Sequence, residues 1–140
     1  MALDPAAINA ALYAVIKSDA AGASARAATG AGTSAGVIPA HALRAPALPA
    51  RPFLAWRAGV VSGESEEMRG IGGAWWAYDD SQQGYARIDA LLGLVEAAYA
   101  PPEGIIAGGR TVVSSLGPQS EDGAINLYCR FIQITHRRRA

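Results

Sequence analysis

Two adjacent carboxylates come closer to an acid–base site than any other residues of this chain. Asp79 and Asp80 follow a strand-like apolar run, and paired carboxylates transfer protons or hold metal ions in many enzymes. Adjacent residues at a strand end point to different sides, so these two carboxylates do not converge. Capping of the following helix, by Asp80 or Ser81, explains them more simply, because such side chains accept hydrogen bonds from free backbone N–H groups.

Other side chains that carry out chemistry are few and scattered. Neither His41 nor His136 has a carboxylate or cysteine nearby at metal-ligand spacing. Cys129 is the single cysteine, which excludes an intrachain disulfide and indicates core packing. Ser114 and Ser115 lack the Gly-x-Ser-x-Gly turn that activates a serine nucleophile. We therefore expect no catalytic residue, no metal and no cofactor, and a protein that is not an enzyme.

Length and charge limit the classes of protein to consider. A chain of 140 residues suits a single domain spanning 1–140. Twelve basic and twelve acidic residues leave no net charge at pH 7, which argues against general attraction to nucleic acid or to membranes. No run reaches the roughly 20 apolar residues that span a bilayer. Together with the single cysteine, this leads us to expect synthesis in a reducing cytoplasm.

Hydrophobic periodicity predicts the elements that position these side chains. Ile8, Leu12, Val15 and Ile16 form an apolar stripe at helical spacing. The predicted helices span 4–18 and 81–99, and the predicted strands span 53–61, 71–78 and 124–135, with 105–106 and 110–116 as a third extended region. The expected fold is α+β, with a four-stranded, mainly antiparallel sheet and two helices packed on one face.

The segment from 20 to 36 is rich in alanine and glycine, with a short helical turn expected near 23–28. Its 29–34 portion has too little apolar surface to offset the entropy of ordering, so we expect a flexible loop or one ordered by a neighbouring subunit. The glycines lack the Gly-Lys-Ser/Thr ending of a phosphate-binding loop. The connector that follows, 37–52, contains four prolines and should be extended and irregular.

Charged side chains gather at a turn and at the C-terminus. Such separated charges suit head-to-tail or ring contacts; a solvated turn and a solvated tail are the alternative. The charged members of this candidate interface are Glu64, Glu66, Glu67, Arg69, Arg137, Arg138 and Arg139.

Two neighbouring tryptophans extend the candidate interface. Trp75 and Trp76 lie on one predicted strand, so their rings should face opposite sides of the sheet. One ring is expected in the core. The other, assigned to Trp76 in the candidate interface, is either an exposed contact surface or is covered by the chain's own loops.

The order of these elements resembles the tail terminator and tail completion proteins of long-tailed bacteriophages, over nearly the whole chain. The matching segments are 51–56 (RPFLAW), 73–78 (GAWWAY), 88–92 (IDALL) and 125–131 (INLYCRF). The segment from the glycine-rich loop to Pro52 is longer than is usual in that family. The resemblance implies a structural virion protein without a cofactor, in which six subunits form a ring at the head-proximal end of the tail tube.

The resemblance also implies the partners and the location. Such a ring ends polymerisation of the tail tube protein and presents a surface to the head–tail connector or head-completion protein, with DNA passing through the lumen without sequence specificity. The expected location is the virion tail or neck, after assembly in the host cytoplasm, with no membrane contact. Another neck or head-closure ring component, and a small-molecule-binding α+β domain built around Trp75 or Trp76, are the alternatives.

Overall fold

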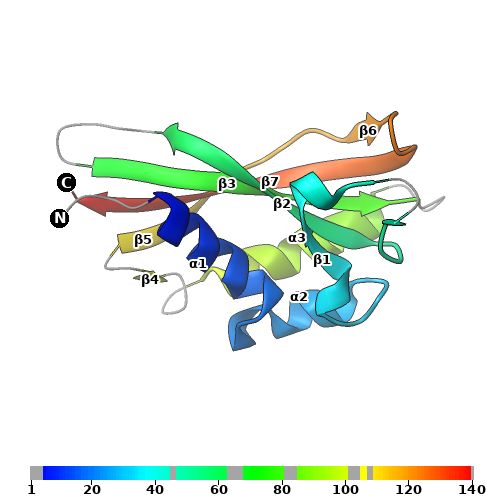
Figure 1. Cartoon of the computed structure of the whole chain (residues 1–140), viewed down its shortest axis with the longest axis horizontal. Helices are drawn as coiled ribbons and strands as arrows, with labels where there is room; N and C mark the ends of the chain where they lie inside the picture. The colour runs from blue at the N-terminus through cyan, green and yellow to red at the C-terminus, as the bar shows by residue number, and fades with distance from the viewer. Residues whose placement is uncertain are drawn as a thin grey trace.

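The computed structural model of the chain describes residues 5–44, 47–62, 68–80, 85–100, 105–106 and 109–139. Within these ranges, three α-helices lie on one side of a β-sheet (Figure 1). The helices are α1 (Pro5–Lys17), α2 (Ala23–Ala28) and α3 (Ala86–Ala98). The strands are β1 (Val37–Pro39), β2 (Phe53–Ser62), β3 (Met68–Asp79), β4 (Ile105–Ile106), β5 (Gly109–Leu116), β6 (Ser120–Asp122) and β7 (Leu127–Arg139).

The sheet is mixed and has seven strands in the order β1-β2-β3-β7-β5-β4, with β6 paired to β7 beside the main path. β1 is parallel to β2, and every other pair is antiparallel. The predicted four-stranded, mainly antiparallel sheet with two helices is therefore wrong. The short strands have only two or three residues; β1 and β6 were not predicted, and β4 was expected at 105–106 as part of one extended region with β5. Such short strands carry no periodic signal and form only by pairing with a longer neighbour.

The face of the sheet toward the helices forms the larger core. Leu12 and Ile16 of α1 and Leu91 of α3 pack with Trp75 of β3 and Ile134 of β7, and all five are buried. The apolar stripe predicted for the first helix is buried throughout, so that prediction is confirmed. Its predicted cap, Asp4, lies outside the described residues.

The helix-free face is covered over only part of its area. A second buried cluster there contains Phe53, Ala55, Tyr78, Leu127 and Cys129. Phe53 stacks on Tyr78 with ring centroids 5.1 Å apart. Leu43 and Leu48 of the proline-rich connector pack against this cluster, so the connector serves as its lid. The rest of this face, toward the middle of β3 and β7, has no such cover among the described residues.

The alanine- and glycine-rich segment contains α2, as predicted for 23–28, flanked by two 3₁₀ turns. Two basic side chains connect it to α1: Lys17 Nζ donates to the Ser34 and Val37 carbonyls, and Arg26 donates to the Ile16 carbonyl at 2.8 Å. Gly30 N–H donates to the Pro52 carbonyl, and a Cβ at Gly30 would lie 2.2 Å from the Arg51 carbonyl oxygen. Glycine is needed at this close approach. The predicted flexibility of the segment stays a prediction.

Candidate functional site

The two neighbouring tryptophans lie on opposite faces of β3, as their alternation predicted. Trp75 is completely buried beneath the helices. Its indole Nε1–H donates to the Tyr99 hydroxyl at 2.8 Å, and that hydroxyl donates to the Leu12 carbonyl at 2.6 Å. Burial raises the pKa of Tyr99 above the usual tyrosine range, which keeps its hydroxyl protonated as a donor. Trp75 is therefore a core residue with all its polar capacity used.

Trp76 is half-buried on the helix-free face and borders a groove there. Phe131 of β7 packs against it at a centroid distance of 4.7 Å, and the Arg57 guanidinium of β2 lies 5.9 Å from its ring centroid. The Trp76 indole N–H has no hydrogen-bond partner. The sequence left open whether the Trp76 ring is exposed or covered. In the structure the ring is half-covered.

The groove beside Trp76 has a volume of about 360 Å³. Its floor is made by small residues of β2 and β3, and its polar groups are Arg57 and Gln133. The small residues are Ala58, Gly59, Gly72, Gly73 and Ala74. Arg57 is the one ionisable side chain that lines it among the described residues. Acid–base chemistry needs at least two convergent titratable groups or a titratable group beside a nucleophile, and this lining offers neither. The groove is suited to binding.

A second cavity, of about 420 Å³, lies at the opposite face beside the same edge of β2. Tyr13 of α1, Pro39 at the end of β1, His41 and Trp56 contribute to its walls. Trp56 is only 5% exposed, and its indole N–H also lacks a hydrogen-bond partner. Arg57 and Ala58 border both this cavity and the Trp76 groove, so the two hollows flank one stretch of β2.

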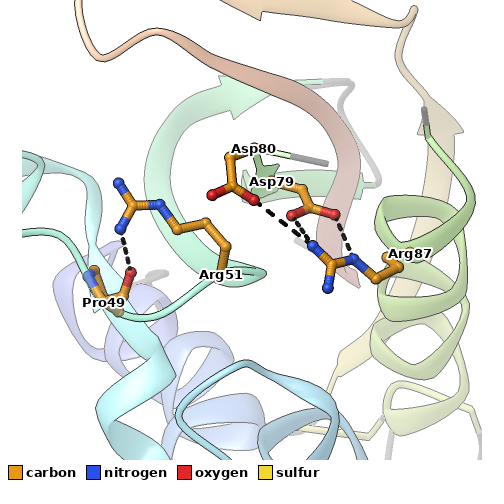
Figure 2. A network of polar contacts seen from close by, with 5 residues as sticks. All are labelled: Pro49, Arg51, Asp79, Asp80 and Arg87. Atoms are coloured by element: carbon orange, nitrogen blue, oxygen red, sulfur yellow. Dashed lines mark hydrogen bonds and ion pairs between the residues drawn. The ribbon is translucent and has the colours of Figure 1, made fainter. Parts of the chain in front are cut away.

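The paired carboxylates act structurally, and not as helix caps. α3 begins at Ala86 with Tyr85 in the cap position, so the predicted cap by Asp80 is wrong, and Ser81 lies outside the described residues. Asp79 is fully buried and accepts two hydrogen bonds from the Arg87 guanidinium, which is also 3.7 Å from Asp80 (Figure 2). Hydrogen bonding to Asp79 raises the pKa of Arg87. The fork-like guanidinium thereby fastens the first turn of α3 to the end of β3.

The predicted charged interface is only partly described. Glu64, Glu66 and Glu67 lie outside the described residues. The basic residues converge in register, because Arg69 of β3 pairs with Arg138, and Gly70 pairs with Arg137. Arg139 follows at the end of β7, opposite Met68. Arg69 and the C-terminal arginines therefore meet at one end of the sheet.

The register adds one basic residue that sequence reasoning missed. Arg110 of β5 pairs with Arg137 on the other side of β7. The backbone register therefore places Arg69, Arg110 and Arg137 on three neighbouring strands at this end of the sheet. Arg57 and Phe131 beside Trp76 were also missed as members of a site. Their signal was the two-residue alternation of each strand, but cross-strand register was needed to bring them together.

The other reactive side chains do not form a site. Burial raises the pKa of the Cys129 thiol to about 11, so it stays protonated and unreactive near neutral pH. His136 is buried in β7, whereas His41 is exposed. No group of three or more His, Cys, Asp or Glu side chains among the described residues is placed to hold a metal ion.

Comparison with known proteins indicates no function, so any function must be inferred from the fold and these surfaces. No protein-family model matches the chain, and no curated protein matches its sequence. None of the helices in the described ranges has the length and apolar character needed to cross a bilayer. The class that the structure defines is an α+β protein with a mixed sheet, one face covered by helices and the other partly open.

Proposed function

We propose that this protein is a structural assembly protein that forms a ring of identical subunits, and that the ring closes the head-proximal end of a phage tail tube. In this role it ends polymerisation of the tail tube protein and offers a surface for head joining, in the tail or neck of the virion. The specific version, a tail terminator with six subunits, rests on the resemblance of the sequence to that family. The general version rests on the surface described above.

The half-covered Trp76 face is the observation that carries the proposal. Aromatic residues and arginine are enriched at protein–protein contacts, and here Trp76, Phe131 and Arg57 surround a groove. The Trp76 indole N–H is itself buried and has no hydrogen-bond partner among the described residues, so a partner would contact the exposed part of the ring. The lining lacks the convergent titratable groups of an active site.

The arginine-rich end of the sheet supports the second part of the proposal. Arg69, Arg110 and Arg137 lie on three neighbouring strands at this end. A concentration of positive charge there fits an acidic surface on a neighbouring ring component or the phosphates of DNA passing through a lumen. Contacts of this kind are independent of base sequence.

The test is the mass of the purified protein across concentration, alone and with tail tube protein. We expect a ring, or a monomer that becomes a ring on tube ends and stops tube growth. Trp76→Ala should stay folded and weaken ring or tube binding about tenfold or more, the loss expected for a hot-spot tryptophan. Tyr128→Ala is the matched control, because Tyr128 of β7 is also a partly exposed aromatic side chain but lies outside the groove. Equal binding by both variants would contradict the assignment of this face.

A second candidate function is binding of a small molecule in the Trp76 groove. The volume of about 360 Å³ lies within the range of small-ligand sites, and Arg57 could hold an anionic group. A protein that stays monomeric at all concentrations and ignores tubes would replace the assembly proposal with this one. A ring that attaches to the connector but leaves tube growth unchanged would indicate a different neck or head-closure component.

A further inference from the structure

The sheet has an open edge at each side. β1 pairs with β2 only from Leu54 to Trp56 and ends at Pro39, after which the chain turns away. β2 continues to Ser62, so its 57–62 stretch has a strand neighbour on the β3 side alone among the described residues. At the other side, β4 pairs with β5 only at 109–110, so 111–116 of β5 is open in the same way. Unpaired backbone groups on an edge are a template for another strand.

The two open stretches lie at the same height, meaning the same position along the strand direction. Cross-strand register connects them through β3 and β7, along rows that run perpendicular to the strands. The rows are Trp56–Trp75–Ile132–Leu116, Arg57–Ala74–Gln133–Ser115 and Ala58–Gly73–Ile134–Val113. The open part of β2 therefore faces outward at the level where the open part of β5 faces outward on the opposite side.

The strand directions allow the two edges to meet in a second copy of the chain. β2, β3, β7 and β5 are successively antiparallel, so β5 runs opposite to β2. A neighbour related by rotation about an axis along the strands would bring its β2 beside β5 in antiparallel orientation. Its helices would then lie on the same side of the joined sheet. Pairing of two different edges is a heterologous contact, and such contacts repeat until a ring closes.

The side chains at the two edges also fit together. Leu116 at the end of β5 is 49% exposed, and it and Tyr128 are the exposed large hydrophobic side chains among the described residues. The cavity of about 420 Å³ beside Trp56, walled by Tyr13 and Pro39, opens next to the free stretch of β2. Leu116 belongs to the Trp56 row, where Pro39 of β1 already pairs with Trp56, so a new backbone ladder would begin at Ser115 opposite Arg57. Leu116 would then lie just past the end of the ladder, next to the cavity beside Pro39.

Charge also favours this pairing. The 111–116 stretch contains no ionisable side chain, and Arg57 is the one charged residue of the 57–62 stretch, so no like charges meet. Each stretch contains a bulge, at 59–60 in β2 and at Ser114 in β5. Bulges discourage pairing of an edge with an arbitrary strand, so regular pairing is expected only for the residues between them.

We propose that β5 of one copy pairs antiparallel with the free stretch of β2 of the next copy, with Leu116 seated in the cavity beside Trp56. This inference rests on the proposed ring and names its subunit contact. The Trp76 groove borders the same stretch of β2 on the other face, so the joint between subunits lies beside the surface that receives the tube or the neck.

Ring mass as a function of concentration tests the buried leucine. Leu116→Gln should raise the concentration for half-assembly about tenfold or more, because a buried leucine becomes polar. Tyr128→Gln is the matched control, since it also replaces a partly exposed apolar side chain on the sheet, away from both edges, and should leave assembly unchanged. Equal assembly by the wild type and Leu116→Gln would overturn the seating of Leu116.

An engineered cross-link tests the strand pairing independently of any loss of stability. Arg57→Cys and Ser115→Cys are made as separate proteins and mixed under mild oxidation. Opposed residues of an antiparallel pair lie about 4.5–5.5 Å apart, within the span of a disulfide. We expect dimers in the mixture and none from either variant alone, because Cys129 is buried.

The outcomes separate this inference from the proposed function. Wild-type rings that neither depend on Leu116 nor yield the cross-link would overturn the strand pairing and leave the ring function intact. A wild-type chain that forms no ring, alone or with tubes, would overturn the proposed function and this inference with it. Cross-linked dimers together with a Leu116-dependent ring would support both.

Discussion

The two faces of the sheet give their tryptophan side chains different surroundings. Under the helices, the Trp75 indole N–H donates to Tyr99, which in turn donates to the Leu12 carbonyl. On the helix-free face, the indole N–H of the next residue, Trp76, has no partner and its ring borders a groove. The difference lies in what covers each face: packed helices on one side, and only the Leu43 and Leu48 connector on the other. A closed face supplies stability, and a half-open one is available for contact.

Replacing each tryptophan in turn is the strongest way to break this comparison. Trp75→Ala should lower the free energy of unfolding by about 3–5 kcal/mol, because it leaves a large cavity in the core. Trp76→Ala should cost only about 1–2 kcal/mol, since its ring is half-buried. Urea unfolding followed by circular dichroism measures both values. Equal losses would show that the helix-free face contributes as much to folding as the covered one.

The attachment of the helix layer to the sheet is tested at Asp79. Asp79→Asn removes one partner of a buried, doubly hydrogen-bonded pair and should lower stability by about 1–3 kcal/mol. The estimate stays below that of a fully buried ion pair because Arg87 is 42% exposed and can be solvated. Asp80→Asn is the matched control, expected to change stability by less than about 0.5 kcal/mol, as Asp80 is 62% exposed. A similar effect from both would mean that the buried pair is not special.

The hydrogen-bond chain under the helices sharpens the comparison further. Tyr99→Phe keeps the ring but removes the hydroxyl that joins Trp75 to Leu12, so the buried Trp75 indole N–H loses its acceptor and the Leu12 carbonyl loses its second donor. We expect a loss of about 1–2 kcal/mol in thermal or urea unfolding. Tyr13→Phe provides the control, because stacking of this ring on Trp75 at 5.8 Å does not need the hydroxyl. If both variants lose the same amount, the hydrogen-bond chain contributes nothing of its own.

The smallest effect is expected from alkaline titration of the helix-free face. Burial raises the pKa of Tyr78 to about 12 from 10.0, so the folded state holds this proton more tightly than the unfolded state does. The stabilisation is complete below pH 10 and is lost as the pH rises toward 12. Tyr78→Phe should flatten the fall of unfolding free energy between pH 10 and 12. The raised pKa of Cys129 acts with the same sign from pH 9 to 11, so Cys129→Ala isolates the tyrosine. An unchanged profile in Tyr78→Phe would show that Tyr78 does not titrate with unfolding.

Part of the fold follows from local sequence pattern. The stripe from Ile8 to Ile16, the short helix at 23–28 and the opposite orientations of Trp75 and Trp76 needed only the spacing of residues along the chain. The long strands were predicted close to their observed positions for the same reason. β1 escaped prediction because a three-residue parallel strand in a proline-rich segment exists only by virtue of its pairing with Leu54 to Trp56.

The candidate site was less accessible to sequence reasoning. Trp76 was selected as a single residue, but Arg57 and Phe131 join it through the register of β2, β3 and β7. Asp79 was assigned to helix capping because Arg87 lies eight residues further on, beyond the reach of a local motif. Cys129 of the last strand was expected to pack in a core, without a prediction of which one. In the structure, Cys129 and Leu127 face the helix-free side, whereas Ile132 and Ile134 face the helices.

The sequence by itself determined the approximate positions of the main helices and strands, the apolar stripe of the first helix and the alternation of side chains, because these depend on neighbours a few residues apart. Only the tertiary structure decided the strand order, the face that the helices cover, the meeting of Arg69 with the C-terminal arginines and the two edges left open. Those features depend on pairings between segments tens of residues apart. Their free energy comes from burial and backbone hydrogen bonds that no local pattern records.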